Sequence, residues 1–406
     1  MPRTVVRICG WSSVDYREQK SKIDEFGGKE IGSAMRLKVT PEAALNFTKI
    51  SVRTICSWPP PPDATKLQII LFEVFWWISH LFLVLLALPL MLAVYEYRRN
   101  PSILTKTLCE VSAIAQTAIK MAICRGQYNR FQVLFSEMET FLKHANSHER
   151  TVLQRYVDKV AIFHAFITIS AYLTAFAFAC GPLVLSQPFP SEATYPFPID
   201  SRFVKIILLV LQEVAIIQAG AGVAVDCQAA VLIWFTVARF ELLALKMKKV
   251  ESEHELYGYL LEHQKLLKYA NEMRLAVRFV AFAAIALTTV GVTCGGLQLI
   301  SHQPLSVKGQ FCILILTAAL ELFAYAWPAD NLISASESIG RAAYNSPWIG
   351  KSSKMLTSLL ILFRRSNEPL VISINGIVPA VSLNFYGDFL SSAFAYFTTL
   401  RVLVGE

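Results

Sequence analysis

The chain alternates between long apolar runs and polar segments. Three runs, residues 74–94, 160–191 and 279–307, contain no Asp, Glu, Lys or Arg. Each exceeds the roughly 18 apolar residues that indicate a transmembrane helix. With weaker runs included, the pattern predicts seven spans: 67–95, 102–124, 160–185, 203–237, 278–300, 310–327 and 370–400.

The connections between these spans differ in charge. The segment before the first span carries 11 Lys and Arg, and the connections after spans two, four and six carry 6, 8 and 5, with Arg278 at the edge of span five counted in the 8, whereas the others carry two or fewer each. Short loops rich in Lys and Arg stay cytoplasmic, which predicts a cytoplasmic N-terminus and an extracellular C-terminus. The second span is interrupted by Lys106, Glu110 and Lys120, and it is retained partly because the alternation depends on it.

Some predicted helices are longer than a membrane requires. The pattern from Arg202 to about Val250 is continuous and would measure about 70 Å, against a hydrocarbon core of about 30 Å. The next segment places Leu256, Leu260 and Leu267 at helical spacing on one face. A second set of apolar residues precedes the last span, at Trp348, Leu356, Leu359, Leu360 and Phe363.

These extensions either lie on lipid headgroups or pack into a cytoplasmic helical domain that holds subunits together, and we favour the domain. The fold class predicted is an all-α membrane protein with seven transmembrane helices and cytoplasmic helical extensions. Its expected parts are a cytoplasmic segment (1–66), helices one to four (67–237), an extension (238–277), helices five and six (278–327), a second extension (328–369) and the last helix with its tail (370–406).

Composition agrees with a membrane protein and argues against several functions. Hydrophobic residues make up 54% and charged residues 17%, against a usual charged share of about 25%. The net charge of +8 lies between spans rather than on one face of a domain, so no nucleic acid partner is expected. The eight cysteines show no ligand spacing and are expected to be reduced. No nucleophile–base arrangement appears, so we expect no enzyme, cofactor or metal site.

The last span carries an unusual number of polar groups. They fall at three- and four-residue steps and form one stripe, while aromatic residues and an alanine form another. A polar stripe in a membrane either packs against neighbouring helices or faces water, and we favour a wet pore wall. The polar stripe contains Asn384, Asp388, Ser391, Ser392, Ala395, Thr398 and Thr399, and the second stripe contains Phe385, Phe389, Ala393 and Phe397.

Three segments in this order resemble the insect odorant receptor family: "LLEHQKLLKYANEM", "ASESIGRAAYNSPW" and "AYFTTLR". The resemblance covers most of the chain from residue 101 onward. The chain departs from the family pattern at Ala395, which replaces a serine, at Ala326, at Trp327-Pro328 and in the terminal "VLVGE". The pattern of the related gustatory receptors in the last span is not found.

The resemblance implies an odorant-gated, non-selective cation channel in the plasma membrane of olfactory sensory neurons. Such receptors form tetramers with a shared odorant co-receptor, and cytoplasmic helices anchor the subunits to one another. The last span lines the pore, which implies pore-lining roles for Asn384, Asp388, Ser392, Ala395, Thr399 and Leu403.

The resemblance also implies a pocket for a small volatile ligand in the outer half of spans two, three, four and six. Alternatives are a gustatory receptor, a G-protein-coupled receptor of opposite orientation, and a transporter that uses Glu110, Glu213, Asp226 and Glu321 as an ion path. For these four acids we favour interhelical hydrogen bonds. The expected pocket residues are Leu108, Ser112, Tyr172, Phe176, Ala179, Leu208, Leu211, Gln212, Phe311 and Ile315.

Overall fold

The computed structural model describes residues 39–184, 188–374, 376 and 378–404, with side chains up to Thr399. In this part of the chain nearly every ordered segment is helical, and the exception is an isolated antiparallel bridge between Ile374 and Val378. The all-helical fold class is therefore confirmed.

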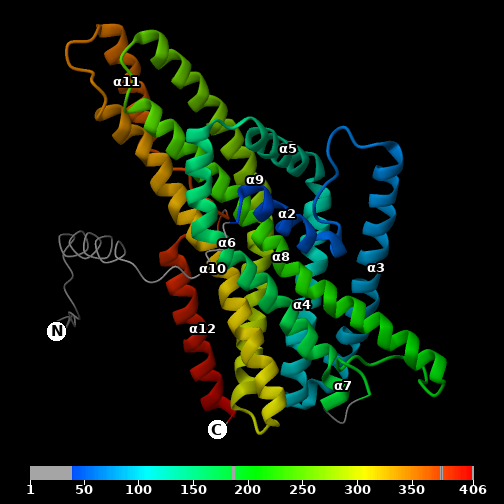
Figure 1. The fold of residues 1–406 in the computed structure, drawn as a ribbon. Coiled ribbons are helices and arrows are strands. Elements are labelled where there is room, and N and C mark those ends of the chain that lie inside the picture. The colour runs from blue at the N-terminus through cyan, green and yellow to red at the C-terminus, as the bar shows by residue number, and fades with distance from the viewer. Residues whose placement is uncertain (1–38, 185–187, 375, 377, 405–406) are drawn as a thin grey trace, which may run out of the picture. The chain divides into compact units, whose positions relative to one another are not determined.

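Six of the described helices are long and apolar enough to cross a membrane. They correspond to the first six predicted spans, and Figure 1 shows them running alongside one another. The sixth helix continues through Pro328, where the predicted span ended. The six are α3 (Lys66–Glu96), α4 (Pro101–Gly126), α6 (Ser147–Ala179), α8 (Arg202–Met247), α9 (Glu253–Ile300) and α10 (Leu305–Tyr344).

Local sequence explains where several of these helices begin. At Thr65, Asn146 and Ser252 a capping side chain accepts the backbone N–H three residues later, and a Gln or Glu at that third position binds back to the cap. Such capping boxes satisfy N–H groups that a helix start leaves unpaired. At α4, Asn100 caps the start and Pro101 occupies the first turn, where its missing N–H is not needed.

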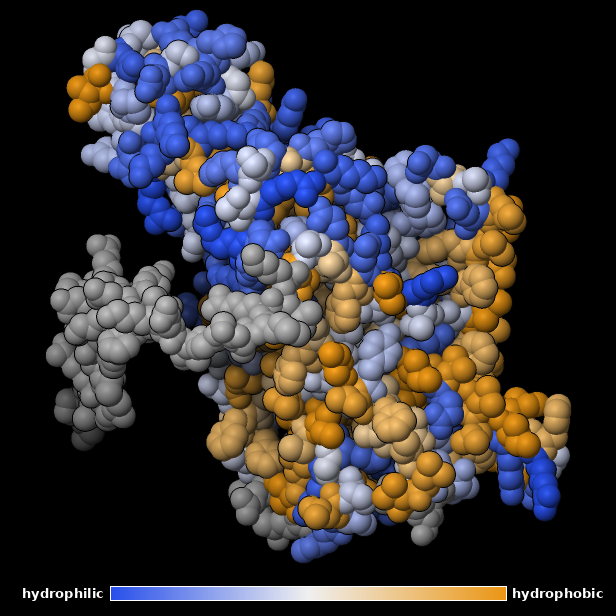
Figure 2. Space-filling view, viewed as in Figure 1, coloured by the Kyte–Doolittle hydropathy of each residue, from blue (hydrophilic) through white to orange (hydrophobic). Residues whose placement is uncertain are grey.

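The chain reaches beyond the spans as a bundle of helical extensions. α8 is continuous over 46 residues, as predicted, and the segment after it joins the predicted fifth span in the 48-residue α9. α11 (Ser353–Ser366) packs against α10, and Lys246 bridges α8 to Glu262 of α9 at 3.0 Å. Figure 2 shows hydrophilic residues over this end and hydrophobic residues over the region below it.

The residues before the first span pack into the helix bundle. α2 (Pro41–Ser51) and the 3₁₀ turn η1 (Arg53–Ile55) contact α8, and Val52 and Ile55 are fully buried. The hydroxyl of Ser79 in α3 donates to the Thr54 carbonyl at 3.0 Å. Residues counted as a cytoplasmic segment from the sequence thus contribute to the core of the bundle.

The remaining helices are short or lie at the end of the chain. α5 (Tyr128–His144), α7 (Gly181–Val184) and the 3₁₀ turn η2 (Tyr97–Arg99) connect the spans, and no helix was expected at α5. The last helix, α12, runs over Leu383–Val404, so a span beginning at 370 is wrong for residues 370–382. There the Ile374–Val378 bridge encloses Gly376, whose φ of +79° is a left-handed backbone conformation that favours glycine and does not occur within an α-helix.

Candidate functional site

A cavity of about 130 Å³ lies among α3, α4, α6, α8, α9 and α10. Its walls are mainly apolar, and include Leu86, Leu90, Ile216 and Leu314. An apolar cavity of about 150 Å³ is large enough to hold benzene. The space therefore suits a small, mostly apolar molecule.

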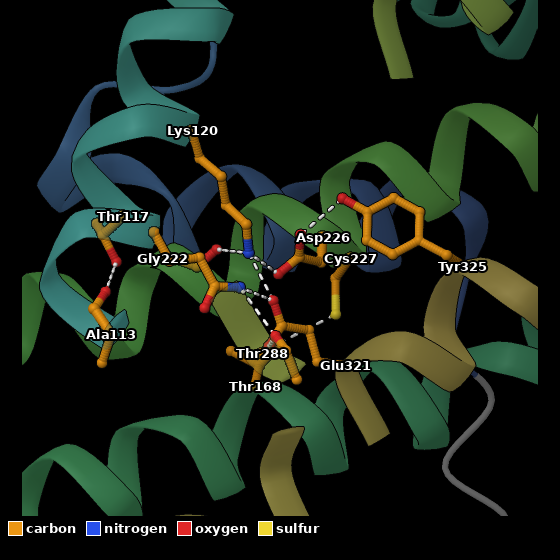
Figure 3. Close-up of polar contacts among 11 residues, drawn as sticks. Ala113, Thr117, Lys120, Thr168, Gly222, Asp226, Cys227, Thr288, Glu321 and Tyr325 are labelled. Atoms are coloured by element: carbon orange, nitrogen blue, oxygen red, sulfur yellow. Dashed lines mark hydrogen bonds and ion pairs between the residues drawn. The ribbon is translucent and has the colours of Figure 1, made fainter. Parts of the chain in front are cut away.

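Buried charges occupy one end of this cavity, which we call the floor. The ammonium of Lys120 in α4 lies 2.5 Å from the carboxylate of Asp226 in α8 and 2.6 Å from that of Glu321 in α10. The side chains of Lys120 and Asp226 are 1% and 0% exposed. Figure 3 shows the three side chains converging from their helices.

Further hydrogen bonds satisfy the two carboxylates. Tyr325 donates to Asp226 Oδ1 at 2.6 Å, and Thr288 of α9 donates to Glu321 Oε2 at 3.2 Å. Gln116 donates to Glu321 Oε1. Isolated ionised groups are very costly inside a membrane protein, whereas paired and hydrogen-bonded ones persist. The floor thus links α4, α8, α9 and α10.

The floor depends on a close approach of α4 and α8. The Gly222 carbonyl of α8 accepts a hydrogen bond from Lys120 at 3.5 Å. A Cβ atom built on Gly222 would lie only 2.2 Å from Thr117 Oγ1 of α4. Any larger residue at this position would force the two helices apart.

The opposite end of the cavity, the loop end, lies under residues 188–201. Glu110 of α4 lines the cavity, and its Oε2 accepts the backbone N–H of Glu192 at 3.1 Å. The side chain of Glu192 pairs with Lys106 at 2.6 Å. Gln212 of α8 accepts from Ser191 Oγ at 2.9 Å. These bonds hold the loop over the ends of α4 and α8.

The helix α12 turns its two stripes in different directions. Phe389 and Ala393 are buried against the rest of the chain, and Phe397 lies against Gly296 of α9. The polar stripe is on the exposed side of the helix, so it does not pack against the described helices of its own chain. Its exposed residues are Asn384, Asp388, Ser391, Ser392, Ala395, Thr398 and Thr399. The Leu403 side chain lies outside the described part of the chain.

The sequence model of the 7tm odorant receptors matches residues 100–394. The chain belongs to the odorant receptor family. Odorant receptor 10 of Aedes albopictus is 25% identical over 144 residues, which cover 34% of this chain and 37% of that protein. Odorant receptor 67c of Drosophila melanogaster is 27% identical over 146 residues, 36% of each chain. The matched region therefore spans little more than a third of these curated relatives.

Solved structures show the same fold. The insect olfactory receptor OR5 from Machilis hrabei superposes with a TM-score of 0.77 at 14% identity, over 88% of this chain and 97% of that one. The same protein in complex with eugenol gives a TM-score of 0.75 over 89% and 99% of the chains. The receptor thus has the membrane fold of that olfactory receptor.

The receptor places the ten expected pocket residues differently from the sequence analysis. Ser112 lines the cavity, Gln212 holds the loop, and Phe311 is buried against Phe178 in an edge-to-face contact. Phe176 is 66% exposed on the surface of α6, and Tyr172 donates to the Ser51 carbonyl of α2. The positions that do not line the described cavity are Leu108, Tyr172, Phe176, Ala179, Leu208, Leu211, Gln212, Phe311 and Ile315.

Many of these differences are a shift of one residue. Cys109, Ala175, Phe178 and Leu314 line the cavity, each next in sequence to an expected position. One residue rotates a side chain by about 100° around a helix of 3.6 residues per turn. Sequence spacing located the helices, and at these four positions the cavity is lined by the residue next to the expected one.

The charged floor was only partly visible in the sequence. Interhelical hydrogen bonds were expected for Asp226 and Glu321 and are confirmed, whereas Glu110 binds a loop instead. Lys120 was treated as an interruption of the second span. One basic and two acidic residues inside otherwise apolar spans were the available signal for a buried ion cluster.

The expected anchor residues divide into buried and exposed positions. Leu256 and Leu359 are buried, and Leu260, Leu267 and Trp348 are partly buried within the extension. On α11 the other three remain on the surface of the single chain, although they are apolar. They are Leu356, Leu360 and Phe363, at 38%, 67% and 39% exposure.

Proposed function

We propose that the receptor is the odorant-binding subunit of a heteromeric, ligand-gated, non-selective cation channel formed with the shared odorant co-receptor. The observation that carries this proposal is the mainly apolar cavity between helices contributed by most of the bundle. A small volatile molecule gains affinity there by burying apolar surface, at about 25 cal/mol per Å². The channel would act in the plasma membrane of olfactory sensory neurons, with the N-terminus inside.

The exposed polar stripe of α12 supports its role as this subunit's part of the pore wall. Asn384, Asp388 and Ser392 face away from the chain's own helices. Polar side chains at membrane depth need water or a partner. A water-filled pore shared with neighbouring subunits supplies that environment, and the phenylalanine stripe holds the helix against α9 and α10.

Exposed apolar residues on α11 support a subunit interface at the helical extensions. Leu360 and Ile361 are exposed on this helix, in a part of the molecule whose surface is mostly hydrophilic (Figure 2). Apolar patches of this kind mark interaction sites on soluble surfaces. A second subunit would cover them and place its own α12 beside the pore axis.

Gating requires that the odorant bind the open arrangement of the channel more tightly than the closed one. A ligand shifts a closed–open equilibrium only by as much as it binds one state more tightly. α9 and α10 line the cavity and also contact α12, so they connect ligand binding to the pore helix.

The test is to express the receptor with an odorant co-receptor in cells that lack both. Whole-cell currents are recorded across a panel of volatiles. We expect odorant-evoked cation currents that require both subunits. The proposal would be contradicted if the receptor reached the cell surface with the co-receptor and no volatile in the panel evoked a current.

A further inference from the structure

The charged floor of the cavity has little hydrogen-bonding capacity left for a ligand. Lys120 donates to both neighbouring carboxylates and to the Gly222 carbonyl. Asp226 accepts bonds at both oxygens, and so does Glu321. The hydrogen-bonding groups of the floor are therefore used in contacts between the protein's own helices.

Hydroxyl groups in the cavity wall also use their hydrogens within the protein. Ser112, Thr117 and Thr174 each donate to a carbonyl of their own helix, at 2.7, 3.2 and 2.8 Å. Ser191 donates to the Gln212 side chain. What these groups present to the cavity is oxygen lone pairs, which accept hydrogen bonds.

Glu110 differs from every other described residue that lines the cavity. Its Oε1 is buried and has no hydrogen-bond partner among the described residues, and no other described lining residue has a buried side-chain nitrogen or oxygen in that state. The residue is 8% exposed. Because Oε2 is held by the N–H of Glu192, the orientation of the carboxyl group is fixed.

The two ends of the cavity are well separated. Glu110 and Lys120 lie about 15 Å apart along α4, at 1.5 Å per residue. A ligand whose polar group meets Glu110 therefore extends its apolar part along the walls toward the floor. An unpaired buried acceptor costs free energy that a ligand donor recovers on binding.

We propose that Glu110 Oε1 recognises the ligand, and that the receptor selects volatiles whose polar group carries an O–H or N–H. Aliphatic alcohols, phenols and primary amines would bind more tightly than ethers, esters and ketones of the same size. A site built to hydrogen-bond one group discriminates strongly against analogues that lack it. The inference rests on the proposed function in taking this cavity as the ligand site.

The experiment measures binding without using channel currents. The purified full-length receptor in detergent is titrated with benzyl alcohol and with anisole, and thermal stabilisation gives the affinity. The two compounds are isomers, and only the alcohol has a donor. We expect the alcohol to bind about tenfold more tightly, the ratio given by one hydrogen bond worth about 1.4 kcal/mol.

Two substitutions at Glu110 separate the chemistry from packing. In Glu110→Gln the amide oxygen keeps the Glu192 N–H and an NH₂ donor replaces the acceptor at Oε1, so we expect the preference for the alcohol to shrink or disappear. Glu110→Met should bind both isomers alike. Glu213→Gln, the same change in a span residue that does not line the cavity, should keep the preference for the alcohol.

Equal binding of both isomers to the wild-type receptor would overturn the inference. So would a preference that Glu110→Gln leaves unchanged, or no stabilisation by either compound. If Glu110→Met does not fold, Glu110→Gln decides alone. A clear preference for the alcohol without odorant-evoked currents would support the inference and contradict the channel proposal, so the two failures are distinguishable.

Discussion

Lys120 is a residue that a transmembrane helix tolerates only with partners. Its two carboxylates and the Gly222 carbonyl supply them, on α8 and α10. Removing one member of a buried ion cluster leaves uncompensated charge and typically costs 3–5 kcal/mol, whereas replacing the whole cluster can be neutral.

We therefore predict that Lys120→Met lowers the stability of the receptor by about 3–5 kcal/mol. Thermal unfolding and surface expression measure the effect. Adding Asp226→Asn and Glu321→Gln to Lys120→Met should restore much of the loss. The exposed Lys205→Met serves as the control and should change stability by less than about 0.5 kcal/mol. A Lys120→Met receptor as stable as this control would show that the cluster contributes nothing.

The burial of His263 predicts how the stability of the helical extension depends on pH. It is buried on α9, beside Phe240, and burial together with Arg365 lowers its pKa to about 4. The unfolded chain takes up this proton near pH 6.5 and the folded chain only near 4. Stability is therefore fully present above about pH 6.5 and declines as the pH falls toward 4, by about 3 kcal/mol. His263→Leu should flatten this part of the stability–pH curve in thermal melts, and an unchanged slope would contradict the assignment.

At the residue scale, the sequence showed which residues form interhelical polar contacts better than it showed the direction in which each side chain points. It placed Asp226 and Glu321 in interhelical bonds but could not name Lys120 as their partner, because partners depend on which helices are neighbours. The same limit explains why Phe176 was expected in the pocket although it faces outward. Helix rotation is set by packing against other helices, which a single apolar run does not encode.

The helix α12 makes the sharpest prediction at the scale of elements. Ser392 is on the exposed polar side and the adjacent Ala393 is buried. In channels formed with the co-receptor, a charged thiol-reactive compound applied from outside should change the current of Ser392→Cys channels and leave the current of Ala393→Cys channels unchanged. Wild-type channels control for reaction at native cysteines. An equal change in current for both variants would contradict a pore-facing stripe.

Several elements were predictable because their signals are local. Capping boxes at Thr65 and Ser252 mark helix starts, and apolar length fixed the six long helices. The start of α12 was missed because residues 370–382 are largely apolar, although the backbone at Gly376, with a φ of +79°, is not helical. α10 passed through Pro328 because a proline in a membrane helix can be accommodated by its neighbours.

Assembly belongs to the scale of the whole molecule. Leu360 on α11 is 67% exposed in the single chain, next to Ile361 at 65%. If a neighbouring subunit covers it, Leu360→Glu should reduce assembly with the co-receptor roughly tenfold, as loss of a buried contact worth more than 1 kcal/mol would. Val133→Glu, at an equally exposed apolar position on α5, is the matched control. Size-exclusion chromatography of the co-expressed proteins measures assembly, and intact complexes with Leu360→Glu would exclude this interface.

Alternating loop charge and helix length predicted the plan of the molecule, and the OR5-like fold agrees with the helical part of that plan. The insertion of Val52 and Ile55 into the bundle could not be predicted, because a short apolar segment has no periodic signal. The cavity was equally hidden, since it is a space left between helices rather than a pattern within one.

The central claim is that one cavity binds the odorant and that binding opens the channel. Ala219 lines this cavity on α8, and Ile217 on the same helix faces outward. The most direct measurement compares odorant concentration–response curves of Ala219→Leu and Ile217→Leu receptors, co-expressed with the co-receptor and matched for surface level. We predict that Ala219→Leu shifts the curve for large odorants to at least about tenfold higher concentration, because overpacking the cavity costs about 1–3 kcal/mol. Ile217→Leu should leave the curve unchanged. Identical curves for the two variants and the wild type would contradict the account.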